Sequence, residues 1–220
     1  MMPNVNKMYT YLRGYLVGAG MTESIKALQY ARKAHEGQHR RGDGSPYIIH
    51  PLGMACYAVA LGIKDDNIIA TILLHDVVED CDKQIEYLPV NDTIKRAVKY
   101  MTITIFDTDT SKIETKCRYF NELLDCREAL ICKALDRYDN LADMPVHFTA
   151  DGLAKNIAET ETLLLPILKK AKEKYADLAD ILFVLRTNLT TLCDAIKPPC
   201  YNEWTKWDSL YKREDTKNDE

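Results

Sequence analysis

The stretch His75-Asp76-Val77-Val78-Glu79-Asp80 determines how the fold of this chain is interpreted. It follows the apolar run Ile68–Leu74, which is typical of a buried helix, where charge is costly unless it is paired or bound to a metal ion. Positions 75 and 79, and likewise 76 and 80, are four residues apart and therefore lie about 5.4 Å from each other along one helix face. This pattern predicts a metal site in which the His-Asp pair binds a divalent ion and the Glu-Asp pair reaches a metal-bound water.

His50 is a candidate for a third ligand, because a His-Asp pair alone cannot complete such a site. It directly precedes Pro51, which fits the first position of a helix that runs to Leu61 and stops at Gly62. We therefore expect His50 at the mouth of a helix, where side chains converge on clefts.

Asp136 is a candidate for a fourth ligand, on a helix whose positions 133, 136 and 140 share one face. This stripe carries Lys133, Asp136 and Asn140. A cation, a carboxylate and an amide on one face suit a metal-bound polyanion.

Apolar residues recur at helical spacing along most of the chain, so the sequence predicts an all-α fold, a helical bundle with the metal site between helices. Pro166 lies inside one of the predicted helices, where we expect a kink or a break. The predicted helices cover residues 23–36, 51–61, 66–79, 92–101, 112–125, 127–142, 152–174 and 176–196.

Length and composition favour one compact domain. The chain has 220 residues, of which 46% are hydrophobic, so we expect a single domain over residues 1–200. A C-terminal tail would follow at 201–220, with its last nine residues disordered. The net charge of −4 disfavours nucleic-acid binding. Seven cysteines without a C-x-x-C pair are expected to be reduced and mostly core-filling.

Neither a membrane span nor a targeting segment is expected. No apolar run reaches the roughly 18 residues that a spanning helix needs. The N-terminus lacks the pattern of a cleavable signal peptide, so we expect a cytoplasmic protein.

Five blocks of sequence, in the same order and at similar separations, resemble the hydrolase domain of the RelA/SpoT homologue family, a branch of the HD phosphohydrolase superfamily. The resemblance implies an HD-domain helical bundle. It lacks the few hundred further residues that synthetase and regulatory domains would need, so the chain resembles a stand-alone small alarmone hydrolase. The blocks are Ala34–Gln38, Pro46–Leu52, Leu73–Asp80, Lys133–Asn140 and Ile157–Ile167.

The resemblance also implies one divalent metal ion, usually manganese in the family, although the ligand chemistry alone also allows iron or zinc. Glu79 and Asp80 resemble the acidic pair that orients and deprotonates the attacking water in hydrolysis-competent members. The ligands implied by the resemblance are His50, His75, Asp76 and Asp136.

The implied reaction removes the 3′-pyrophosphate from guanosine tetra- or pentaphosphate and gives GDP or GTP plus pyrophosphate. A small-molecule guanosine polyphosphate is therefore the expected partner, and the oligomeric state stays open. The residues expected to bind the substrate are Arg40, Arg41, Lys133 and Asn140.

Two departures from the family pattern concern the substrate. The loop over residues 38–46 is about one residue longer than usual, so Arg40 and Arg41 both remain candidates for the contact with the base. Tyr138 and Asp139 stand where the family has leucine and histidine. Two alternatives therefore remain: hydrolysis of another small nucleotide, such as the 2′-phosphate of NADPH or a nucleoside monophosphate, and a non-catalytic nucleotide sensor.

Overall fold

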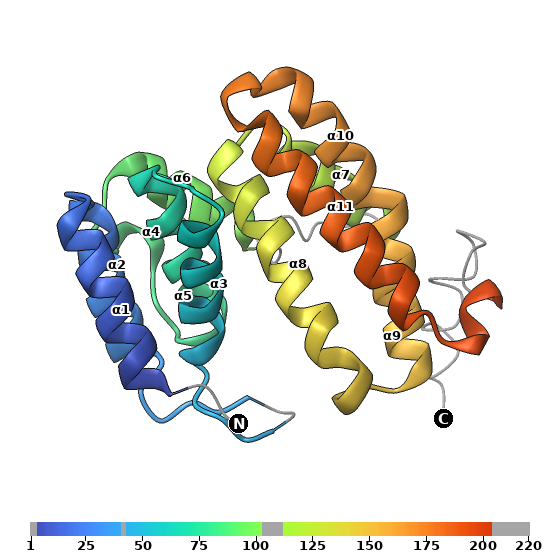
Figure 1. Cartoon of the computed structure of the whole chain (residues 1–220), viewed down its shortest axis with the longest axis horizontal. Coiled ribbons are helices and arrows are strands. Elements are labelled where there is room, and N and C mark those ends of the chain that lie inside the picture. The colour runs from blue at the N-terminus through green and yellow to red at the C-terminus, as the bar shows by residue number, and fades with distance from the viewer. Residues whose placement is uncertain (1–3, 41–42, 103–111, 204–220) are drawn as a thin grey trace. The chain divides into compact units, whose positions relative to one another are not determined.

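Helices make up the fold of the computed structural model, which describes residues 4–40, 43–102 and 112–203 (Figure 1). Within these ranges there is no β-strand, and the one extended pairing is an isolated bridge between His39 and Pro46. The predicted all-α fold is confirmed. The α-helices are α1 (Val5–Gly18), α2 (Thr22–Ala34), α3 (Ile49–Ala60), α4 (Asp66–Leu74), α5 (Val77–Asp80), α6 (Asp92–Met101), α7 (Lys112–Leu123), α8 (Arg127–His147), α9 (Ala150–Glu159), α10 (Leu165–Lys174) and α11 (Ala179–Ile196). Short 3₁₀ helices cover Ile85–Tyr87, Ala176–Leu178 and Pro199–Glu203, and a π-helix covers Thr160–Leu164.

Two compact units divide the chain. The first comprises Met1–Ile105 and Asp125–Asp136, and the second comprises Phe106–Leu124 and Arg137–Glu220. The prediction of a single domain over 1–200 stays a prediction, and most of the predicted tail, residues 204–220, lies outside the described residues. No helix in the described part of the chain is long and apolar enough to cross a membrane.

Helix α4 is the centre of the first unit, because α2, α3 and α6 all pack against it. The run Ile68–Leu74 is completely buried, as its apolar sequence predicts. Asp65 begins the helix and accepts hydrogen bonds from the backbone N–H groups of Asn67 and Ile68. This capped, buried helix leads directly into the His-Asp pair.

The predicted continuous helix over 66–79 is wrong, because α4 ends at Leu74 and α5 begins at Val77. The two residues between them form a turn, in which Asp76 has φ −97° and ψ −5°. The carbonyl of Ile72, to which residue 76 would donate in a continuing helix, accepts a hydrogen bond from His75 Nδ1 at 2.8 Å. The break sets His75 and Asp76 in a corner between two helices.

Helix α3 begins two residues before its predicted start. Its first residue is Ile49, so His50 lies inside the first turn rather than before it, and Pro51 occupies the third helical position. A proline is tolerated there because the first N–H groups of a helix have no partner within the helix. The end agrees with the prediction, since α3 stops at Ala60 and Gly62 adopts φ +85°.

Helix α1 was not predicted. Asn4 caps it by accepting a hydrogen bond from the N–H of Lys7 at 3.0 Å, and Leu12 and Leu16 are fully buried. The asparagine cap and the spacing of these two leucines are the signals that could have identified it.

The interruption predicted at Pro166 is confirmed in the second unit. Helix α9 ends at Glu159, the π-helix Thr160–Leu164 follows, and Pro166 lies at the start of α10. Because proline has no N–H, the hydrogen bond that residue 166 would donate to the carbonyl four residues earlier cannot form, and α-helical regularity is lost there. Helix α10 then packs against α11.

Candidate metal centre

His75 presents one ring nitrogen to the interior of the first unit. The ring is buried, and its Nδ1 donates to the carbonyl of Ile72, which can only accept. In the neutral ring the lone pair is therefore on Nε2. This buried atom has no hydrogen-bond partner among the residues that the structure describes. A histidine whose other nitrogen is fixed in this way is the usual arrangement of a metal ligand.

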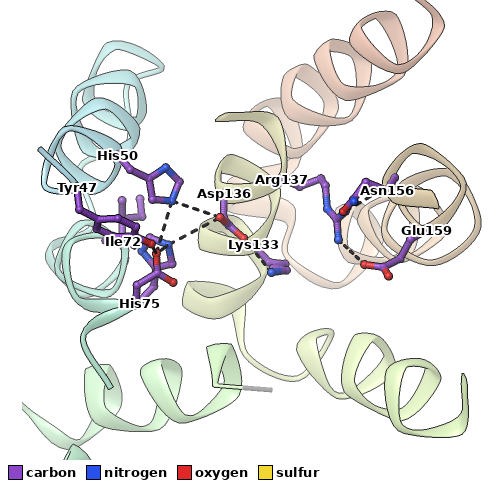
Figure 2. Close-up of polar contacts among 10 residues, drawn as sticks. Tyr47, His50, Ile72, His75, Lys133, Asp136, Arg137, Asn156 and Glu159 are labelled. Carbon is purple, nitrogen blue, oxygen red and sulfur yellow. Dashed lines mark hydrogen bonds and ion pairs between the residues drawn. The ribbon is translucent and has the colours of Figure 1, made fainter. Parts of the chain in front are cut away.

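Donor atoms from α3, α8 and the α4–α5 corner converge on Nε2 of His75 (Figure 2). The ligand atoms of His50, His75 and Asp76 all lie within 4.8 Å of one another. The separations are 2.9 Å from His75 Nε2 to Asp76 Oδ2, 3.7 Å from His50 Nε2 to Asp76 Oδ2, 3.4 Å from His50 Nε2 to Asp136 Oδ1, and 3.8 Å from His75 Nε2 to Asp136 Oδ1.

These separations fit a single divalent ion. Bonds of about 2.1 Å place neighbouring ligands of an octahedral ion about 3 Å apart and opposite ligands about 4 Å apart. Two imidazole nitrogens and two carboxylate oxygens form a mixed ligand set that suits a first-row transition metal. The sequence-predicted ligands His50, His75, Asp76 and Asp136 thus lie together.

Both carboxylates of the cluster are held in their charged form. Burial alone would raise the pKa of Asp76, but His75 beside it brings the value down to about 2. Burial likewise opposes ionisation of Asp136, yet Lys133 and then His50 hold its pKa well below the ordinary value. Two negative charges in a buried position favour a divalent cation between them.

The same charges act on His75. Although burial lowers its pKa, the Asp76 carboxylate raises it further, so the net effect is an increase. A proton and a metal ion therefore compete for Nε2, and metal binding is expected to weaken as the pH falls.

The acidic pair follows the metal centre along the chain. Glu79 and Asp80 are exposed on α5, and the N–H of Asp80 donates to the carbonyl of Asp76 at 2.8 Å. Gln38 holds the same turn from outside by donating its Nε2 to the carbonyl of Asp80 at 2.7 Å. The pair thus lies one helical turn after the metal-ligand candidate Asp76.

The predicted substrate-binding residues are not gathered in one place. Lys133 Nζ lies 2.8 Å from Asp136 Oδ2, so it adjoins the cluster. Arg40 lies in the loop between α2 and α3, where its N–H donates to the carbonyl of Ser45 at 2.8 Å, and Arg41 lies outside the described residues. Asn140 belongs to the second unit, one turn beyond Asp136 on the same face of α8.

Tyr47 is the site residue that sequence reasoning missed. Its hydroxyl donates to Asp76 Oδ2 at 2.5 Å (Figure 2). It lies three residues before His50, within a conspicuous block of the sequence resemblance, and that position was the available signal.

Comparison with known proteins gives the family. A family model described as an HD domain matches residues 27–102. The zebrafish (Danio rerio) protein named guanosine-3′,5′-bis(diphosphate) 3′-pyrophosphohydrolase MESH1 is 32% identical over 125 residues, which are 54% of this chain and 68% of that protein. Its human counterpart is 29% identical over 133 residues, or 58% of this chain and 73% of that protein.

A longer relative aligns with a smaller share of its own length. The Aquifex aeolicus protein named guanosine-3′,5′-bis(diphosphate) 3′-pyrophosphohydrolase is 31% identical over 148 residues, which are 66% of this chain and 21% of that protein. The resemblance inferred from the sequence is therefore confirmed, and the chain belongs to the family of HD-domain proteins that includes the zebrafish and human MESH1 proteins.

Proposed function

We propose that this chain removes the 3′-pyrophosphate of guanosine tetra- and pentaphosphate, giving GDP or GTP and pyrophosphate, with the help of one divalent metal ion. The observation that carries this proposal is the convergence of two imidazole nitrogens and two ionised carboxylates on the buried, unpartnered Nε2 of His75. The names of the zebrafish and human relatives supply the substrate.

The ion would be held by the four residues of the cluster, and we propose manganese as its identity. When bound, such an ion polarises a phosphoryl oxygen and lowers the pKa of a water molecule. The residues that would hold it are His50, His75, Asp76 and Asp136.

Glu79 and Asp80 are proposed as the groups that receive the proton of the attacking water. Both are exposed carboxylates that follow Asp76 within one turn, so they can reach solvent and substrate while the ligand itself stays mostly buried. A positioned carboxylate of this kind contributes as a general base.

Positive and neutral polar groups complete the proposed substrate site. Lys133 neutralises Asp136 and adds a positive charge beside the cluster, where an anionic substrate would otherwise meet two carboxylates. Arg40 or Arg41 would pack against the base, and Asn140 would contact the nucleoside.

The test is to incubate the manganese-loaded protein with guanosine tetraphosphate, with and without a chelator, and to resolve the products by anion-exchange chromatography. GDP and pyrophosphate that disappear with chelator support the proposal. Release of phosphate from another nucleotide, with guanosine tetraphosphate left intact, would assign a different substrate to the same site. Bound metal without turnover of any nucleotide would indicate a sensor.

A further inference from the structure

The loop between α2 and α3 reaches the metal centre through one hydroxyl group. Tyr47 donates to Asp76 Oδ2 at 2.5 Å, across 29 positions of sequence. The same carboxylate oxygen lies 2.9 Å from His75 Nε2 and 3.7 Å from His50 Nε2. The hydroxyl therefore acts on the very oxygen that faces both histidines.

The backbone of Tyr47 is fixed on both sides. Its N–H donates to the carbonyl of Gln38 at 2.9 Å, and its own carbonyl accepts from the N–H of His50 at 3.0 Å. The second bond ties the tyrosine directly to the first turn of α3, which carries a candidate ligand. The position of Tyr47 is thus coupled to that of His50 through the main chain.

The ring of Tyr47 is fixed as well. It lies 4.9 Å from the His35 ring at a tilt of 31°, and it meets the His50 ring edge-on at 5.9 Å, centroid to centroid. His35 is itself buried, with Nδ1 at 2.7 Å from Gln38 Oε1. Because the ring has neighbours on both sides, the hydroxyl has little freedom to leave Asp76.

The hydroxyl remains a donor under ordinary conditions. Burial, and then the charge of Asp76, raise the pKa of Tyr47 above its usual value, so the phenol keeps its proton. A phenol that donates to a charged, mostly buried carboxylate forms a strong, short hydrogen bond. Such a bond limits rotation of the carboxylate about its own axis.

We propose that Tyr47 is a positioning residue for the metal: its hydroxyl fixes the orientation of the Asp76 carboxylate, so that Oδ2 faces the two histidines before the ion arrives. The inference rests on the proposed role of Asp76 as a ligand. Outer partners of metal ligands are general in metalloproteins, and their loss lowers metal affinity about 10–100-fold.

The variant Tyr47→Phe tests this, because it keeps the ring between its two histidine neighbours and removes only the hydroxyl. The dissociation constant for Mn²⁺ is measured by competition with a chromogenic chelator. We expect Mn²⁺ to bind Tyr47→Phe about 10-fold or more weakly than the wild type. The control is Tyr87→Phe, which removes the hydroxyl of a tyrosine that is 75% exposed and leaves the affinity unchanged.

Two further readouts separate positioning from a general loss of structure. The melting temperature without metal should be similar in wild type and Tyr47→Phe, whereas the increase caused by a fixed Mn²⁺ concentration should be smaller in the variant. Saturating Mn²⁺ should restore most of the wild-type kcat for guanosine tetraphosphate. If Tyr47→Phe is destabilised, the size of the Mn²⁺-dependent increase still reports the affinity.

A wild-type Mn²⁺ affinity in Tyr47→Phe would overturn the inference and leave the proposed function intact. Failure of the wild-type protein to bind Mn²⁺ would instead contradict the proposed metal centre, and with it the basis for a positioning role. Weakened binding in Tyr47→Phe with normal binding in Tyr87→Phe supports the inference.

Discussion

Replacing Glu159 with glutamine tests whether a buried charge cluster stabilises the second unit. Glu159 is buried, and its two carboxylate oxygens accept hydrogen bonds from the guanidinium of Arg137 and the ammonium of Lys116. Arg137 is also buried and donates to Asn156 Oδ1 at 2.6 Å (Figure 2). Glutamine keeps the size of the side chain, but it removes the charge and brings an NH₂ donor toward two cations.

Two routes lead to a similar magnitude for Glu159→Gln. Although burial raises the pKa of Glu159, Arg137 and Lys116 lower it from 4.5 to about 2. Each pKa unit corresponds to about 1.4 kcal/mol, so the ionised carboxylate contributes about 3 kcal/mol at neutral pH. Mutational data on buried ion pairs give about 3–5 kcal/mol for removing one partner. We therefore expect the free energy of unfolding to fall by about 3 kcal/mol.

The assay is urea unfolding at neutral pH, followed by circular dichroism. The matched control is Glu173→Gln on α10, which makes the same chemical change at an exposed position and should alter the free energy of unfolding by less than about 0.5 kcal/mol. Both variants change the net charge of the protein equally. The difference between them therefore isolates the buried cluster around Glu159.

The pH dependence gives a second test with a definite sign. The pKa of Glu159 is lower in the folded state than in the unfolded chain, so its stabilisation is complete above about 4.5 and is lost as the pH falls toward about 2. The stability difference between wild type and Glu159→Gln should narrow over that window. A glutamine variant as stable as the wild type at neutral pH, or a difference that does not change with pH, would refute the reasoning.

Three further predictions concern the metal centre and the helix caps. His75→Ala should abolish the Mn²⁺-dependent increase in melting temperature, and an undiminished increase would remove His75 from the ligand set. Glu79→Gln should keep the wild-type Mn²⁺ affinity but lower kcat about 100-fold or more, whereas Glu86→Gln should stay active; a fully active, metal-bound Glu79→Gln would contradict the general-base role. Asp66 accepts from the N–H of Ser24 at 2.7 Å and so caps α2, which has no side-chain cap of its own; Asp66→Ala should cost about 1–2 kcal/mol in urea unfolding, and no loss would show that water replaces the cap.

Much of the secondary structure was predictable because its signals are local. Helix α6 covers Asp92–Met101 as predicted, and Asn91 caps it by accepting from the N–H of Ile94 at 3.1 Å. The break between α4 and α5 was not predictable in this way. It involves the contact of His75 with the carbonyl of Ile72, and the apolar periodicity continues across it.

The candidate ligands could be named from the sequence, but their supporting contacts could not. His75 and Asp76 follow a buried helix, and a charged pair in that position needs a compensating partner. The hydroxyl that orients Asp76 comes from Tyr47, 29 positions away, and no periodicity within a helix reports a contact of that range.

Helix α8 shows where sequence reasoning stops in this protein. Asp136 and Arg137 are neighbours, both are buried, and successive residues of a helix point about 100° apart, so the sequence indicates two charges with separate surroundings. Asp136 is compensated by Lys133, one turn away, and by His50, whereas Arg137 is compensated by Glu159 (Figure 2). The first of these partners follows from helix spacing, and the other two depend on how distant segments pack. The sequence therefore identifies which buried charges require a partner, and the tertiary structure decides whether that partner is a metal ligand set or an ion pair.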